Sequence, residues 1–382
     1  CALPAQHILP FDSTIPQGPM GTPLRQDAAA IHLHGGLVPW PSDGGPFHWI
    51  STSGAVGASL IGTEWLPAAD GVTLTNDYLY PNHQSARLMW YHDHAIGITR
   101  TNAYAGIATG YILYDNAELA MAGAGLPFPG DILVFQDKVF WDPAIDPNYL
   151  QYAGPTSLGG ALQGDLWYPY IYDPKIWGLM KGGVPPIPSA VAEMFGDTML
   201  VNGTPYPYMN VAGRHRLRLL NACNGRFLNL SFAVENPYNL GEPKIGAKGL
   251  PQLAPVTVWQ IGTEGGFLPA PVLLVNNGVA VAPLLLAPAE RADLIVDFTN
   301  AAGTGIILYN DAGAPFPGGS PLFDFSTQTN NAKTGFGPNT RTLMQFRVGA
   351  GGSAFPLPNL AGANPVLSTV ADTVNGGLKL AA

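Results

Sequence analysis

The stretch that decides the fold is Ala86-Arg87-Leu88-Met89-Trp90-Tyr91-His92-Asp93-His94. Its residues favour extended backbone and include neither glycine nor proline, so the sequence predicts a β-strand. Side chains two positions apart on a strand project from the same face, which places His92 and His94 together. Leu88 and Trp90 precede them on that face, and we therefore expect the two imidazoles at the end of an apolar wall.

The same alternation occurs upstream in Ile31-His32-Leu33-His34-Gly35-Gly36, where His32 and His34 share a face and the glycines end the strand. Neutral imidazole is a ligand for copper, zinc, iron and nickel. Two histidines on one strand face are about 6–7 Å apart, which is too wide for one small ion and suits neighbouring metals in a cluster. A single His-x-His pair is more often a packed or surface pair, but two such strands side by side would direct four imidazoles to one point.

The composition of the 382 residues favours short strands joined by structured loops. Charged residues make up only 11% and hydrophobic residues 47%, with 47 glycines and 37 prolines. This balance predicts an all-β fold of sandwich domains rather than a helix bundle. The net charge of -9 comes without a basic block, which argues against a nucleic-acid partner. No apolar run is long enough to cross a bilayer, so we expect no transmembrane segment.

Strand patterns continue along the chain at the spacing of β-sandwich domains. They lie at residues 29–34, 78–94, 105–115, 131–136, 198–201, 215–220, 227–234, 256–261, 272–274, 293–298, 306–309 and 344–348. Two domains are expected, over 1–116 and 130–348, with an Ala/Gly/Pro-rich connection at 117–129. A Gly/Pro/Tyr-rich excursion interrupts the second domain near 142–195, and 349–382 has the composition of a linker or tail.

The two histidine motifs carry a family resemblance. His32-Leu33-His34-Gly35-Gly36, with Ser42-Asp43-Gly44 downstream, resembles the first copper motif of the multicopper oxidases. Trp90-Tyr91-His92-Asp93-His94, followed by Thr99-Arg100 and Asn102-Ala103-Tyr104-Ala105-Gly106, resembles the second. In detail the sequence is most similar to the three-domain bacterial laccase branch, typified by the spore-coat laccase.

The second half of the chain resembles the middle domain of that branch. The matching segments are Leu200-Val201-Asn202-Gly203, Arg218-Leu219-Leu220-Asn221-Ala222, Gln260-Ile261-Gly262-Thr263-Glu264-Gly265-Gly266, Ala287-Pro288-Ala289-Glu290-Arg291 and Met344-Gln345-Phe346-Arg347-Val348. The resemblance implies tandem cupredoxin-like Greek-key β-sandwich domains, of which the first is incomplete at its N-terminus.

The resemblance also implies copper as the cofactor and a role for each motif residue. His32 would be a ligand of the type 2 copper, and His34, His92 and His94 would be ligands of the type 3 copper pair. Together they would form half of a trinuclear cluster that reduces dioxygen to water. Asp43 would be a catalytic acid that tunes the cluster and helps to supply protons, although an aspartate in this Gly-rich loop is also a common turn former.

Two further copper motifs of the family are missing from this sequence. They are a His-Pro-x-His-x-His motif and a His-Cys-His segment in the third domain, which hold the remaining cluster ligands and the type 1 copper. Cys223 has no adjacent histidine and is expected to be a buried structural residue. The chain therefore resembles a fragment, and we expect the opening strands and the third domain to belong to the same protein, as cleaved segments or as other chains.

The activity implied by the resemblance is that of a laccase-like copper oxidoreductase. It would take single electrons from phenols, amines or metal ions, with dioxygen as the acceptor, and would be secreted, periplasmic or on the cell surface. The alternative is a non-catalytic cupredoxin-fold scaffold with a structural or assembly role. A copper nitrite reductase would need a cysteine within residues 29–115, which contain none. The remaining histidines are expected to pack or lie at the surface: His7, His48, His83 and His215.

Overall fold

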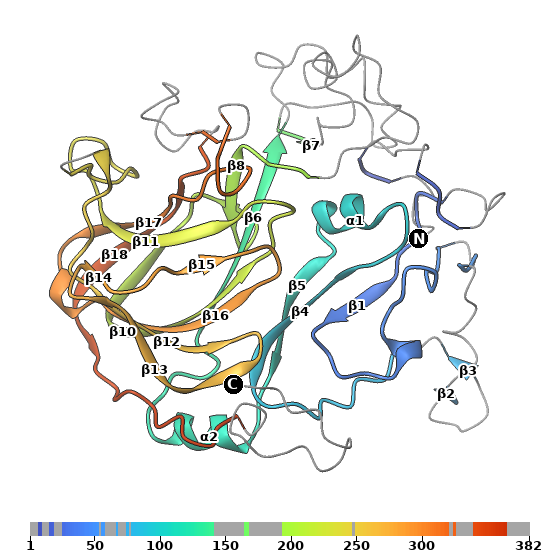
Figure 1. Ribbon diagram of the computed structural model, residues 1–382, viewed down its shortest axis with the longest axis horizontal. Helices are drawn as coiled ribbons and strands as arrows, with labels where there is room; N and C mark the ends of the chain where they lie inside the picture. The colour runs from blue at the N-terminus through green and yellow to red at the C-terminus, as the bar shows by residue number, and fades with distance from the viewer. Residues whose placement is uncertain are drawn as a thin grey trace, which may run out of the picture. The chain divides into compact units, whose positions relative to one another are not determined.

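Strands dominate the computed structural model, which describes residues 7–9, 15–18, 25–52, 55–57, 66–67, 74–75, 78–140, 164–167, 193–246, 249–320, 324–325 and 339–364 (Figure 1). The strands are β1 (Ile31–His34), β2 (Leu66–Pro67), β3 (Leu74–Thr75), β4 (Arg87–Asp93), β5 (Ala108–Leu113), β6 (Asp131–Phe140), β7 (Leu166–Trp167), β8 (Thr198–Val201), β9 (Thr204–Pro205), β10 (Tyr208–Asn221), β11 (Leu228–Val234), β12 (Thr257–Thr263), β13 (Gly266–Asn276), β14 (Val279–Ala280), β15 (Leu285–Leu286), β16 (Arg291–Asp297), β17 (Gly305–Asn310) and β18 (Thr342–Ser353). The helices in these described ranges are α1 (Thr99–Ala105), α2 (Asn116–Gly123) and the short 3-10 turns η1 (Trp40–Ser42) and η4 (Thr299–Ala301). The predicted all-β class is confirmed, and no helix of the described residues is both long and apolar enough to cross a membrane.

The chain divides into two compact units. Unit 1 comprises Cys1–His83, Trp90–Thr109 and Lys138–Met194, and unit 2 comprises Gln84–Met89, Gly110–Asp137 and Phe195–Ala382. The domain boundaries expected from the sequence stay a prediction. The expected excursion near 142–195 lies almost wholly outside the described residues.

Both histidine motifs lie in unit 1, and they belong to a sheet with the strand order β1-β4-β5. β1 and β4 run antiparallel, with Ile31 opposite Asp93 and Leu33 opposite Tyr91. A small apolar cluster packs at the ends of these strands and is formed by Ala28, Ala30, Trp49, Ala95 and Ile98. This cluster includes the residue before β1 and the residue after the second motif, so it packs beside the ends of these strands.

The strands of unit 2 curl around one large apolar core (Figure 1). Their order is β14-β13-β12-β16-β10-β18-β17-β11-β15, and β6 joins at β10. β10 is the central strand, because it pairs antiparallel with β16 and parallel with β18 and β6. Inside the core, the rings of Phe232, Phe298 and Phe346 contact one another with centroids 5.3–6.3 Å apart. This curled unit agrees with the predicted cupredoxin-like sandwich.

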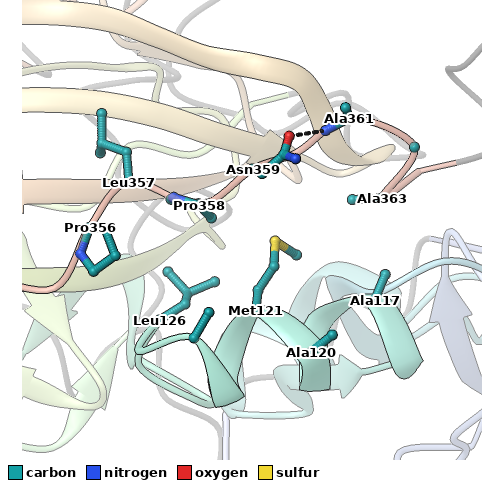
Figure 2. Close-up of a pocket in the computed structure, with 12 residues that line it drawn as sticks. Ala117, Ala120, Met121, Leu126, Pro356, Leu357, Pro358, Asn359, Ala361 and Ala363 are labelled. Carbon is teal, nitrogen blue, oxygen red and sulfur yellow. Dashed lines mark hydrogen bonds between the residues drawn. The ribbon is translucent and has the colours of Figure 1, made fainter.

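The expected connection at 117–129 contains a helix, α2, that the composition did not predict. Asp115 caps this helix, because its side chain accepts a hydrogen bond from the backbone N–H of Glu118 at 2.9 Å. The apolar side of α2 faces residues 356–363 within unit 2. Figure 2 shows Met121 projecting from α2 toward this segment, beside a cavity of about 340 Å³.

β18 also extends to Ser353, beyond its predicted end at residue 348.

Buried charges tie α2 to the central strand. Glu118 Oε1 lies 2.7 Å from Arg216 Nη1 and also pairs with Arg218, both on β10. Arg216 Nη2 in turn lies 2.6 Å from Asp293 Oδ2 on β16. The side chains of Glu118 and Arg216 are fully buried, so this ion-pair network is shielded from solvent.

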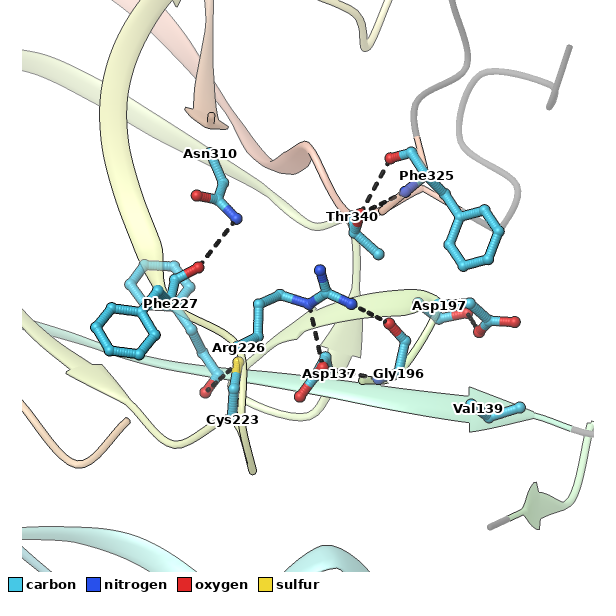
Figure 3. A network of polar contacts seen from close by, with 12 residues as sticks. Asp137, Val139, Gly196, Asp197, Cys223, Arg226, Phe227, Asn310, Phe325 and Thr340 are labelled. Carbon is cyan, nitrogen blue, oxygen red and sulfur yellow. Dashed lines mark hydrogen bonds and ion pairs between the residues drawn. The ribbon is translucent and has the colours of Figure 1, made fainter. Parts of the chain in front are cut away.

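A second buried network lies beside Cys223 in unit 2 (Figure 3). Arg226 donates from Nε to Asp137 Oδ2 at 3.1 Å and from Nη2 to the carbonyl oxygen of Gly196 at 2.6 Å. The Gly196 N–H closes the triangle by donating to Asp137 Oδ2 at 2.7 Å. Cys223 is a buried free thiol whose pKa is raised well above its ordinary value by burial. This agrees with the prediction that it is a buried structural residue.

Candidate metal centre

β1 and β4 bring the two His-x-His motifs side by side. In their antiparallel register, His32 lies opposite His92 and His34 lies opposite Trp90. His94 follows the last residue of β4, and its backbone N–H donates at 2.7 Å to the carbonyl oxygen of the residue that precedes β1. Residues directly opposite one another in an antiparallel pair project from the same face. The pairing register therefore gathers side chains of both motifs on one face.

The closest imidazole pairs come from different motifs. Centroid separations across the strands are 5.1 Å (His32 to His94), 5.3 Å (His34 to His92) and 5.4 Å (His32 to His92). Within a motif they are 5.7 Å for His32 and His34 and 5.8 Å for His92 and His94. One nitrogen from each of His32, His34 and His92 lies within 4.8 Å of the other two. The structure thus brings together all four histidines that the sequence singled out.

Main-chain carbonyl groups orient two of the rings. His32 Nδ1 lies 2.6 Å from the carbonyl oxygen of Asp43, and His92 Nδ1 lies 2.7 Å from the carbonyl oxygen of Asp93. A carbonyl oxygen only accepts, so Nδ1 carries the proton in each ring and the Nε2 lone pair is left for a ligand. Histidines that bind metals are usually held in this way, with the second nitrogen donating to a carbonyl or carboxylate.

The remaining nitrogens also fit a metal. His34 Nδ1 and His92 Nε2 lie 3.1 Å apart. Two nitrogens that each bind a shared ion at about 2.0–2.1 Å are separated by about 3 Å. His94 Nδ1 is buried and has no hydrogen-bond partner among the described residues, a costly arrangement that a bound ion would relieve. Copper, which binds imidazole well, is compatible with this donor set.

The surroundings of His92 and His94 favour the neutral forms of these two rings. Burial lowers the pKa of His92, and the neighbouring His32 and His94 rings lower it further. Burial likewise lowers the pKa of His94, and the His32 ring again adds to the effect. Because a histidine must be unprotonated to bind a metal, these shifts favour the ligand form.

A tight loop carries Asp43 back to the first histidine motif. Asp43 follows η1, where the buried Ser42 accepts a hydrogen bond from the N–H of Leu79 at 2.8 Å. The carboxylate Oδ1 of Asp43 lies 3.3 Å from His32 Nδ1, and the Asp43 side chain is about half exposed, with an accessibility of 48%. Gly44 allows this approach, because it has φ +66° and a Cβ there would lie 1.9 Å from the carbonyl oxygen of Ile31. Asp43 can therefore both contact the centre and exchange protons with water.

Asp93 has a structural position between the two histidines of the second motif. It is completely buried, and its two carboxylate oxygens accept hydrogen bonds from the N–H groups of Ala30 at 2.9 Å and Ala95 at 3.0 Å. Burial raises its pKa to about 6. Its side chain thus joins the end of β4 to the residue that precedes β1.

The contact that Trp90 makes with both motifs was not predicted from the sequence. Its ring lies 4.4 Å from the His92 ring and 5.2 Å from the His34 ring, centroid to centroid. Alternation along β4 placed Trp90 and His92 on one face, but the neighbour from β1 depends on the pairing register, which one strand does not reveal.

The other histidines have different surroundings. His7 Nδ1 accepts from the N–H of Leu9 at 2.9 Å, and His215 Nδ1 lies 3.1 Å from Asp131 Oδ2 in unit 2. His48 packs its ring 5.9 Å from that of Trp40. His83 is exposed. These positions agree with packing or surface roles.

The curled β-sandwich and the convergent imidazoles place the chain among β-rich proteins with a clustered histidine site that could hold metal ions. A scan against protein-family models gives no match. The chain is 32% identical to a laccase of Bacillus subtilis over 347 residues, covering 91% of this chain and 52% of the relative. It is 32% identical to the multicopper oxidase LPR1 homolog 1 of Oryza sativa, covering 85% of this chain and 44% of the relative.

A solved structure of a multicopper oxidase is also similar to this chain. The multicopper oxidase McoA of Aquifex aeolicus superimposes with a TM-score of 0.52 at 25% identity, covering 87% of this chain and 52% of McoA. The chain belongs to the multicopper oxidase family. It spans about half the length of the relatives that it matches.

Proposed function

We propose that this chain forms part of a laccase-like oxidase, which couples the one-electron oxidation of a phenol, an amine or a metal ion to the four-electron reduction of dioxygen to water. The observation that carries the proposal is the convergence of the imidazoles from two antiparallel strands, with centroids 5.1–5.8 Å apart. Copper would supply the one-electron redox chemistry when bound. A non-catalytic scaffold of the same fold would have no need of such a set.

The four histidines would hold the copper, with His32 as the type 2 ligand and His34, His92 and His94 as type 3 ligands. The carbonyl oxygens that accept from Nδ1 of His32 and His92 would keep both rings facing the ions. Asp43, half exposed and 3.3 Å from His32 Nδ1, would pass protons from water toward the oxygen-reducing site.

Four imidazoles are half of the ligand set that this family uses for three clustered ions, so further ligands have to come from elsewhere. We infer that a third-domain segment supplies them, together with the type 1 copper that accepts electrons from the donor. That segment could be part of the same polypeptide or a separate chain. By analogy with the family, we also infer a secreted, periplasmic or cell-surface location.

Copper binding to the 382-residue chain tests the proposal directly. Titration with Cu(II), monitored by equilibrium dialysis and electron paramagnetic resonance (EPR), should show that the unmodified chain binds copper. His32→Asn and His94→Asn should each weaken binding, because each removes one nitrogen ligand. His215→Asn is the matched control, since His215 pairs with Asp131 in unit 2 and should leave binding unchanged. Absence of copper binding by the unmodified chain, or equal binding by all variants, would favour the scaffold.

A further inference from the structure

Trp90 lies against one imidazole from each histidine motif. Its ring is tilted by 34° relative to His92 at a centroid distance of 4.4 Å, and stacks on His34 with an interplanar angle of 29° at 5.2 Å. Its accessibility is only 8%. One indole thus contacts two rings that lie on neighbouring strands.

The backbone explains how one position can do so. Trp90 is directly opposite His34 in the β1–β4 register and two residues before His92 on the same strand face. The indole Nε1 is buried and has no hydrogen-bond partner among the described residues. A buried indole N–H normally finds an acceptor. No hydrogen bond of its own among the described residues therefore fixes the orientation of the ring, which packs against the two imidazoles.

We propose that Trp90 is a positioning residue, which holds His34 and His92 in the rotamers that bind copper. The inference rests on the proposed function, because it assigns a role toward the same ions. His92 is then fixed twice, at Nδ1 by the carbonyl oxygen of Asp93 and on its face by the indole. A rigid aromatic plate is suited to this role, because it restricts two imidazoles at once without competing for their nitrogen atoms.

Copper affinity in Trp90 variants tests the proposal, with Cu(II) alone as the probe. Trp90→Leu keeps the position apolar but removes the flat face, and should weaken Cu(II) binding by about 10–100-fold, the range typical of residues that orient metal ligands. It should also change the EPR hyperfine pattern of the bound ion. Trp90→Phe retains an aromatic face and should recover most of the affinity. Wild-type affinity and an unchanged EPR spectrum in a folded Trp90→Leu protein would overturn the proposal.

Trp49→Phe is the matched control. Trp49 is a second buried tryptophan of unit 1, with 3% accessibility, and packs in the apolar cluster that contains Ala28 and Ile98. The same aromatic replacement there should leave copper affinity and the EPR spectrum unchanged. If Trp49→Phe loses as much copper affinity as Trp90→Leu, the effect is general destabilisation and the assignment to Trp90 is overturned.

Fluorescence gives a second readout, which remains informative if Trp90→Leu does not fold. Cu(II) held by His34 and His92 should quench the adjacent indole, so copper should quench the unmodified chain and Trp49→Phe more strongly than Trp90→Phe. Equal quenching in all three would contradict the proposal. His34→Asn separates the two hypotheses: if it leaves copper binding intact, the proposed function fails, whereas a loss in His34→Asn with none in Trp90→Leu rejects only the positioning role.

Discussion

At the scale of single residues, the path of the loop after the first histidine motif depends on the absence of a side chain at Gly44. Gly44 has φ +66°, and its backbone passes so close to β1 that a Cβ would lie 1.9 Å from the carbonyl oxygen of Ile31. This close approach is what places the Asp43 carbonyl oxygen 2.6 Å from His32 Nδ1. The packing of this loop against β1 therefore also determines the orientation of the His32 ring.

Gly44→Ala should destabilise unit 1 and weaken copper binding. The positive φ alone costs a non-glycine residue about 1–2 kcal/mol, and displacement of Ile31 adds to this. Chemical denaturation of the metal-free protein measures the loss. Gly203→Ala is the matched control, because Gly203 has φ +77° and a methyl group added there would meet nothing within 4 Å. If the two variants lose the same stability and bind copper equally, the close approach at Gly44 has no consequence.

Much of the centre could be predicted at this scale, because His-x-His alternation is a local property of a strand. The partners of the His32 and His92 Nδ1 atoms could not be predicted. They are main-chain carbonyl groups of Asp43 and Asp93, which every residue possesses, so no residue type marks them in the sequence. The sequence pointed to the Asp43 side chain, and the structure adds its backbone.

At the scale of elements, strands were easier to predict than helices. β8 was expected at 198–201 and has those bounds, because its apolar residues end at an Asn-Gly turn. α2 was missed, since its run of alanines beside glycine and proline looks like a connection, although Asp115 and Glu118 have the spacing of a helix cap. What holds α2 in place is non-local, because Glu118 meets arginines far along the chain.

Glu118→Gln should cost about 3–5 kcal/mol of folding free energy, the usual effect of removing one partner of a buried ion pair. Arg216 and Arg218 would keep only Asp293 as a carboxylate partner among the described residues. Urea denaturation monitored by circular dichroism measures the change. Leu119→Ala is the control on the same helix, where a 44% exposed side chain should contribute much less. Similar losses in both variants would mean that α2 is held by its apolar contacts rather than by the ion pairs.

At the scale of the whole molecule, the chain contains two compact units with separate apolar cores, and the convergent histidines belong to one of them. A ligand that binds only a folded state stabilises the unit that carries its site. The fold class of both units was accessible from composition and strand spacing. The division itself was not, because each unit collects three separate segments of the chain.

Copper should therefore raise the unfolding temperature of unit 1 selectively. At a free Cu(II) concentration of about 100 times Kd, linkage predicts about 2.7 kcal/mol of added stability. Differential scanning calorimetry should show one transition moving upward with copper while the transition of unit 2 stays in place. In His94→Asn the shift should shrink. A uniform shift of the whole profile, unaffected by His94→Asn, would contradict a site confined to unit 1.

The main-chain acceptors at Asp43 and Asp93 have a consequence for how this site can change over evolution or in the laboratory. The main-chain carbonyl of residue 43, and not its side chain, orients the His32 ring. The side chain at this position can therefore be replaced without changing the ligand geometry. If Asp43 delivers protons as proposed, Asp43→Asn or Asp43→Glu would alter that delivery and leave copper binding intact. Under the proposed function, reactivity and metal retention would then be separable traits, of which a designer could adjust the first and keep the second.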